Sequence, residues 1–143
     1  MQFNFPPERL SVSNFHLIQK LLDHLGNLRS LRLLRLSASP SLSMLPPSIW
    51  RLQQLEFLDI SLCMALKDLP MEFDQLSKLK MLDMNECSGL KMLPKALANL
   101  RCLKRVICDE DNEQQWLAIK ASSMPNLTVD VVEERFSLDW LDD

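Results

Sequence analysis

The chain has 143 residues, of which 47% are apolar and 24% charged, and its formal net charge at pH 7 is -3. This length predicts one domain, and the apolar share is large enough to form a core. Charges of both signs are interspersed along the chain, so no basic patch favours a nucleic acid or an anionic membrane as a partner.

Residues 1–27 precede the regular part of the sequence. Pro6-Pro7 excludes a helix interior, so we expect residues 1–9 to form an extended connector. The beginning of the chain lacks the positive residues and the continuous apolar run of a secretory signal. A degenerate repeat then places apolar residues in phase with the repeats that follow: Leu10, Val12, Phe15, Ile18, Leu21 and Leu25. Part of this run also has helical spacing, which predicts a helix over residues 14–25.

Residues 28–108 repeat with a period of 24, as in the stretch LSKLKMLDMNECSGLKMLPKALANL that begins at Leu76. The aligned positions are Leu28, Leu52, Leu76 and Leu100; Leu31, Leu55, Leu79 and Leu103; Leu34, Leu58, Leu82 and Val106; Leu36, Ile60, Met84 and Cys108; Ser39, Cys63 and Cys87; Leu42, Leu66 and Leu90; Leu45, Leu69 and Leu93; and Ile49, Phe73 and Leu97. The pattern LxxLxxLxLxxCxxLxxLPxxL resembles the leucine-rich repeat, whose period is about 20 to 29 residues. We therefore expect an α/β leucine-rich-repeat solenoid, with a curved parallel sheet on the concave side and short helices on the convex side.

Each repeat predicts one strand and one helical turn. We expect strands at about residues 31–37, 55–61, 79–85 and 103–109. A turn of helix should follow each Leu-Pro pair, at Pro47–Arg51 and Met71–Gln75, because proline lacks the amide hydrogen that a first helical position does not need.

The pattern stops near Asp111, where no cysteine and no Leu-Pro pair follow. We expect residues 109–143 to form a C-terminal cap, because the last coil of a repeat protein must close its apolar layer to water. Residues 112–122 predict a helix and residues 127–132 a strand. The acidic tail FSLDWLDD would lay Phe136 and Trp140 over the last coil. Three regions result: residues 1–27, the regular repeats at 28–108, and the cap at 109–143.

The residues that could carry metal, thiol or nucleotide chemistry form no recognisable site. The four cysteines lack a CxxC pair, which favours a reducing, cytoplasmic location. Cys63 and Cys87 occupy equivalent positions in neighbouring repeats; the geometry allows a disulfide between them, and the compartment disfavours it. His16 and His24 are too far apart for a metal pair on a helix. With two glycines and no GxxxxGK[ST] motif, we expect neither nucleotide binding nor a cofactor.

The residues between the buried leucines of each strand should point to the concave face, because side chains alternate along a strand. An apolar stripe beside charged residues is typical of a surface that binds a protein. The candidate binding residues are Leu33, Arg35, Phe57, Asp59, Met81, Asp83, Asn85 and Arg105, with Arg32, Lys80 and Lys104 as a charged rim. Coverage of this stripe by a neighbouring domain or by the tail is an equally weighted alternative.

Asp59 and Asp83 fall at equivalent positions and could suggest a catalytic pair of carboxylates with one raised pKa. No histidine, glycine-rich loop or cleft accompanies them. We interpret them as part of a solvated face and expect no enzymatic activity.

Two segments carry a closer resemblance. LEFLDISLCMALKDLPMEF and LKMLDMNECSGLKMLPKAL resemble the repeats of plant intracellular nucleotide-binding immune receptors. The ending, LKRVICDEDNEQQW followed by LTVDVVEERFSLDWLDD, is similar to the C-terminus of their helper class, which has a powdery-mildew-resistance type of coiled coil.

The resemblance implies a role in plant immunity. Helper receptors bind lipase-like signalling heterodimers and form cation-permeable pores at membranes, but the pore-forming and nucleotide-binding domains have no counterpart in this sequence. What carries over is partner recognition and restraint of a parent receptor. We expect a truncated or excised C-terminal part of a longer solenoid. The alternative is an inert fragment or structural repeat protein without a specific partner.

Overall fold

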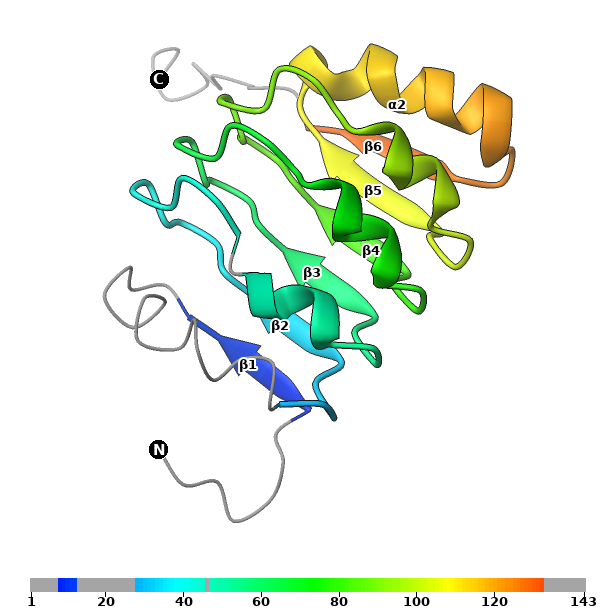
Figure 1. The fold of residues 1–143 in the computed structure, drawn as a ribbon. Coiled ribbons are helices and arrows are strands. Elements are labelled where there is room, and N and C mark those ends of the chain that lie inside the picture. The colour runs from blue at the N-terminus through cyan, green and yellow to red at the C-terminus, as the bar shows by residue number, and fades with distance from the viewer. Residues whose placement is uncertain (1–7, 13–27, 46, 133–143) are drawn as a thin grey trace, which may run out of the picture.

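The computed structural model describes residues 8–12, 28–45 and 47–132. Six strands form one parallel sheet in chain order: β1 (Arg9–Ser11), β2 (Leu33–Arg35), β3 (Phe57–Asp59), β4 (Met81–Asp83), β5 (Arg105–Cys108) and β6 (Thr128–Val131). Figure 1 shows them side by side, from blue at β1 to orange at β6. Leu10, Leu34, Leu58, Leu82 and Val106 lie level with one another across the first five strands. The register predicted from the period of 24 is therefore confirmed.

The regular strands are shorter than the predicted ranges. Each of β2, β3 and β4 has three residues. Backbone hydrogen bonds between neighbouring repeats continue beyond the strands. The amide of Ala38, for example, donates to the carbonyl of Ser61 at 2.9 Å. The chain then turns with a positive φ at Ala38, Leu62 and Glu86, with values of 55°, 60° and 56°. This left-handed residue recurs at the same place in three repeats, three residues after the strand ends.

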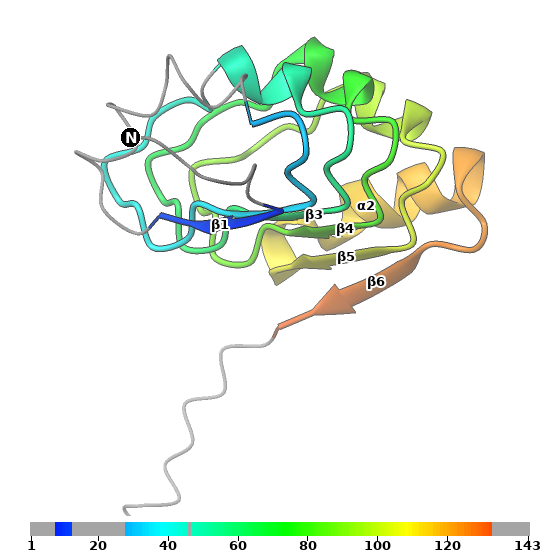
Figure 2. The ribbon, with the colours of Figure 1, turned by 90° about the horizontal axis from the view of Figure 1, so that it is seen from below.

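Short 3₁₀ helices lie on the side of the repeats opposite the sheet (Figure 2). They are η2 (Pro47–Arg51), η3 (Met71–Gln75) and η4 (Lys95–Asn99), and the first two coincide with the predicted helical turns. Pro70 and Pro94 stand just before η3 and η4 in an extended conformation. Their carbonyls accept the first bonds of each turn, from Phe73 at 3.1 Å and from Leu97 at 3.2 Å. Proline thus fixes the approach to each turn without loss of a needed donor.

The core lies between the sheet and these turns. Every aligned position named for residues 28–108 is buried, with at most 8% of its surface exposed. Cys63 and Cys87 are buried free thiols, and no disulfide joins them. Each donates instead to a backbone carbonyl of the preceding repeat, to Leu36 at 3.2 Å and to Ile60 at 2.9 Å. The loop that follows each strand is therefore tied to its neighbour through a side chain as well as through the sheet.

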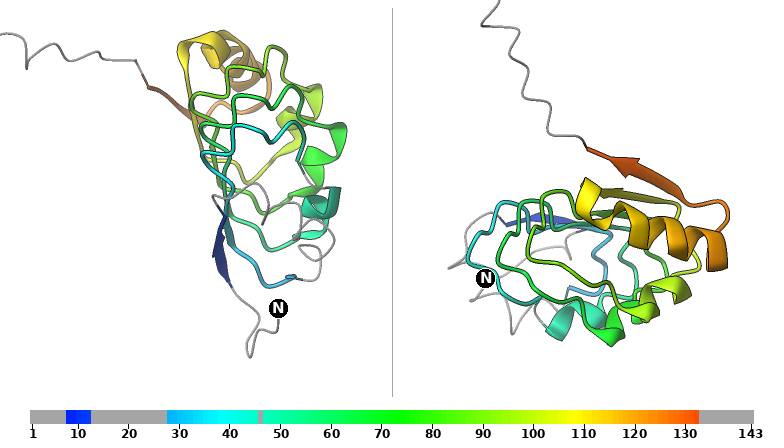
Figure 3. Two further views of the ribbon diagram at one scale, coloured as in Figure 1. Left: turned by 90° about the vertical axis from the view of Figure 1, so that its left-hand side faces the viewer. Right: turned by 90° about the horizontal axis from the view of Figure 1, so that it is seen from above.

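After β5 the chain forms α2 (Glu110–Ser123), the helix predicted at residues 112–122. It begins two residues earlier than predicted, and its first turn carries Glu110, Asp111 and Glu113, which the positive end of the helix dipole stabilises. α2 packs against η4, β5 and β6, and Figure 3 shows it running beside the last strands. The indole nitrogen of Trp116, wholly buried, donates to the sulfur of Met84 at 3.1 Å.

Gln115 of α2 fixes the helix to the last regular repeat. Its side-chain oxygen accepts from the amide of Leu93, and its nitrogen donates to the carbonyl of Lys91, both at 2.8 Å. A single amide side chain thereby satisfies two backbone groups of a loop that has no further repeat beside it.

No helix within the described residues is long and apolar enough to cross a bilayer. The connector expected at residues 1–9 ends earlier than predicted, because Arg9 already belongs to β1, and its first seven residues lie outside the described residues. The helix at residues 14–25, the two histidines and the aromatic tail also lie outside them and remain predictions.

Candidate functional site

The first and third residues of each short strand face away from the core, on what we call the open face of the sheet. Strand register aligns them in two columns. The first column holds Leu33, Phe57, Met81 and Arg105, and the second holds Arg35, Asp59, Asp83 and Ile107. The structure thus brings together, in neighbouring strands, the strand residues that the sequence assigned to a binding surface.

The same columns extend to residues that the sequence analysis did not include. Arg9 of β1 pairs beside Leu33, and Asp130 of β6 pairs beside Ile107. The 24-residue period could have found Arg9. It could not have found Asp130, because β6 follows β5 at an offset of 23 residues, after a helix that replaces the usual loop.

Leu33, Phe57 and Met81 form the apolar stripe of the open face, and all three side chains are half-buried. The guanidinium carbon of Arg35 lies 5.4 Å from the centre of the Phe57 ring, at a distance typical of a cation–π contact. The stripe is therefore less exposed than the sequence predicted.

Asp59 and Asp83 lie next to each other in register, and the expectation of a solvated face is wrong for Asp59. Its side chain folds back onto the chain after β3, where Oδ1 accepts from the amide of Ser61 at 2.9 Å and from its hydroxyl at 2.6 Å. Asp59 is only 8% exposed as a result.

Asp83 is half-buried, and its Oδ1 accepts from the amide of Asn85 at 3.1 Å. Burial raises the pKa of Asp83 above its ordinary value, and the negative charge of Asp59 raises it further. The negative charges of Asp59 and Asp83 therefore repel each other, and their proximity is electrostatically unfavourable.

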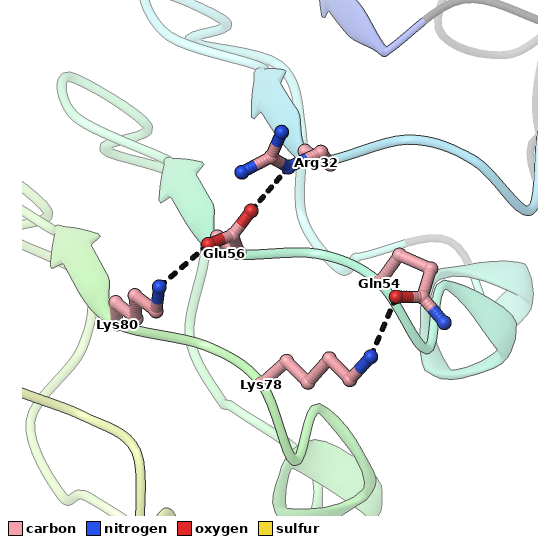
Figure 4. Close-up of polar contacts among 5 residues, drawn as sticks. All are labelled: Arg32, Gln54, Glu56, Lys78 and Lys80. Carbon is pink, nitrogen blue, oxygen red and sulfur yellow. Dashed lines mark hydrogen bonds and ion pairs between the residues drawn. The ribbon is translucent and has the colours of Figure 1, made fainter.

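A charged ladder runs along the side of the sheet where the strands begin (Figure 4). Glu56 forms ion pairs with Arg32 and with Lys80, the latter at 2.8 Å. The hydrogen bond from Arg32 and then that from Lys80 lower the pKa of Glu56 to about 2. Lys104, the third expected rim residue, is exposed. Arg32 and Lys80 therefore lie side by side around an acid that the sequence analysis did not name, and their role as the rim of a binding surface stays a prediction.

Two hollows lie at opposite ends of the strands. A hollow of about 210 Å³ adjoins the stripe where β2 and β3 begin, between Arg32, Glu56, Leu33 and Phe57. A larger one, of about 400 Å³, lies beyond the ends of β4 and β5; we call it the acidic hollow. It is lined by four carboxylates and no basic residue, and by Asn85 and two exposed apolar side chains: Glu86, Asp109, Glu110, Asp111, Met64 and Val132.

The sequence of the chain matches the family described as a leucine-rich repeat region over residues 10–129. The chain belongs to the leucine-rich repeat family. Leucine-rich repeats are typically protein-interaction domains without catalytic activity, and the regular surfaces of stacked repeats provide the contact area. A search of curated proteins finds no match.

Two observations concern metal and thiol chemistry in the described part of this leucine-rich repeat. No group of three or more His, Cys, Asp or Glu residues there is arranged to hold a metal ion. Burial raises the pKa of Cys63, and that of Cys87 to about 12, so these thiols are protonated at neutral pH rather than nucleophilic.

Proposed function

We propose that this leucine-rich repeat chain is a cytoplasmic protein-interaction module of plant innate-immune signalling. In this proposal it is the repeat portion of a helper receptor with a powdery-mildew-resistance type of coiled coil. It recognises a signalling partner, a lipase-like heterodimer or the parent receptor itself, through the open face. The resemblance of the repeats and of the C-terminal segment to helper receptors supports this role.

The proposal also includes a shape. The repeats form a curved solenoid whose concave side is the open face, and α2 and β6 cap its last coil. The solenoid is supported by the parallel register of the strands and by the 3₁₀ turns on the opposite side. The cap is supported by the packing of Trp116 and Gln115 against the last repeat.

One observation carries the choice of surface: Leu33, Phe57 and Met81 lie side by side on neighbouring strands and are only half-buried. Neighbouring apolar side chains that stay partly exposed on a sheet face favour a protein partner. Met71 on η3 is more exposed, at 64%, but η3 lies on the side of the repeats opposite the sheet (Figure 2).

The test combines Phe57→Glu and Met81→Glu in one variant. We expect this variant to lose capture of a purified lipase-like heterodimer while its circular dichroism spectrum stays unchanged. Met71→Glu is the matched control, because it introduces the same charge on the side of η3, and it should retain capture. Unaltered capture by the double variant would refute the assigned surface. A chain that folds yet captures no heterodimer would favour the alternative of an inert fragment.

A further inference from the structure

The second column of the open face holds two carboxylates that form no ion pair within the described residues. Three ion pairs occur within the described residues, and neither Asp59 nor Asp83 takes part in any of them. Oδ1 of Asp59 is satisfied by Ser61, whereas Oδ2 has no hydrogen-bond donor within the described residues and is not sealed from the surface. A carboxylate that is 8% exposed and has no ion-pair partner for its charge is costly unless a ligand supplies one.

The cations near this pair form their closest contacts elsewhere. Arg35 lies level with Asp59 on the neighbouring strand, and its charge acts to lower the pKa of Asp83. Its guanidinium nevertheless stacks over Phe57 and forms no ion pair with either carboxylate. Arg32 and Lys80 bind Glu56, and Arg105 binds Asp130. Asp59 and Asp83 therefore form an acidic position without an ion pair on a sheet where Arg32, Lys80 and Arg105 each have one.

The side chains around Asp59 and Asp83 match both the aliphatic part and the charge of one long cationic side chain. Phe57 and Met81 lie two residues before Asp59 and Asp83 on the same strands and face the same side. Beyond the strand ends, the acidic hollow continues the negative charge, while Met64 and Val132 there are 51% and 43% exposed. Charge complementarity and apolar contact thus point to the same kind of ligand.

We propose that the open face binds a basic protein segment, with one arginine side chain placed between Asp59 and Asp83. Its aliphatic stem lies against Phe57 and Met81, and neighbouring basic residues of the segment extend toward the acidic hollow. Arginine fits better than lysine because its planar fork can donate to two carboxylates at once. This inference rests on the proposed function and specifies the chemistry of the partner.

Selection from a random peptide library displayed on phage, with the whole chain as the target, tests the proposal. We expect the recovered peptides to share an arginine. Replacement of that arginine by glutamine should weaken binding about tenfold to a hundredfold, the loss expected for a charge-assisted hydrogen bond. Asp83→Asn should weaken binding of the original peptides by a similar factor, as should the isosteric Asp59→Asn.

Asp68→Asn is the matched control, since Asp68 is exposed in the loop before Leu69-Pro70 and lies off the open face. It should bind the peptides as the unaltered chain does. Circular dichroism checks the fold of each variant. If Asp59→Asn unfolds, the half-buried Asp83→Asn carries the test alone.

The outcomes separate this inference from the proposed function. Peptides that depend on the open face are identified by their loss of binding to the Phe57→Glu and Met81→Glu variant. If these peptides lack a basic residue, or bind Asp83→Asn as well as they bind the unaltered chain, the arginine site is overturned. The open face then still stands as an interaction surface. Failure to recover any peptide that depends on Phe57 and Met81 would overturn both.

Discussion

The thiol of Cys87 donates a hydrogen bond to the carbonyl oxygen of Ile60, 2.9 Å away in the preceding repeat. Cys63 makes the same bond to Leu36, at 3.2 Å. Burial raises the pKa of both thiols, so both keep their hydrogen and remain donors at neutral pH. The equivalent residue of the repeat before them is Ser39, which is wholly buried and whose hydroxyl has no hydrogen-bond partner within the described residues.

Ser39→Cys should therefore stabilise the chain. A C–S bond is longer than a C–O bond, so a thiol at this position should reach the carbonyl that the hydroxyl does not. We expect the free energy of unfolding, measured by urea denaturation, to rise by about 1 kcal/mol. Ser39→Ala is the control, because it removes the unsatisfied hydroxyl without adding a donor. Equal stabilities of the Cys and Ala variants would show that no new hydrogen bond forms.

The four cysteines should differ sharply in reactivity. Cys102 is exposed, whereas Cys63, Cys87 and Cys108 are buried, and burial raises the pKa of Cys108 to about 12. We expect a disulfide reagent such as Ellman's to titrate one thiol in the native chain and four in guanidinium chloride. Mass spectrometry of the labelled peptides should locate the native label at Cys102, and Cys102→Ser should leave the native chain unreactive. Rapid native labelling of Cys87 would contradict the buried thiol hydrogen bond.

The periodicity of the sequence predicts most of the fold. Because every repeat has the same length, one spacing determines which residues are buried, how the strands align and where η2 and η3 lie. The length of the strands could not be predicted in this way. The left-handed turns at Ala38, Leu62 and Glu86, three residues beyond the strand ends, could not be predicted either, because none of these residues is the glycine that usually marks such a turn.

The candidate site is predicted only in part, because alternation along a strand gives the face of a side chain and not its depth. The columns of Phe57 with Met81 and of Asp59 with Asp83 follow from the period. The burial of Asp59 depends on Ser61, which draws the carboxylate back toward the backbone. The acidic hollow depends on where α2 begins, and no repeat spacing determines that position.

Glu56 should stabilise the fold in a pH-dependent way. Its pKa is about 2 in the folded chain, against an ordinary value of 4.5, because Arg32 and Lys80 bind the charged form. Its contribution is therefore complete above about pH 4.5 and is lost as the pH falls toward 2. The urea midpoints of the unaltered chain and of Glu56→Gln should differ most at pH 7 and converge below pH 4.5.

The ladder also predicts a salt effect on the same variant. In 1 M NaCl, where charges are screened within about 3 Å, the difference between the two midpoints at pH 7 should shrink. Glu72→Gln is the control, since Glu72 is exposed on η3 and forms no ion pair within the described residues. A difference for Glu56→Gln that is constant from pH 7 to pH 3 would contradict the role assigned to its charge.

Leu62 offers the simplest way to stabilise the chain. Its φ of 60° is a left-handed conformation that is unfavourable for leucine by about 1–2 kcal/mol, and 37% of its surface is exposed, so part of its apolar area gains nothing from folding. Asparagine tolerates this conformation far better, so Leu62→Asn should raise the free energy of unfolding by about 1 kcal/mol in urea denaturation. Leu62→Ala is the matched control, because alanine shortens the side chain and keeps the strain. A loss of stability in Leu62→Asn as large as that in Leu62→Ala would mean that the packing of the leucine outweighs its backbone strain.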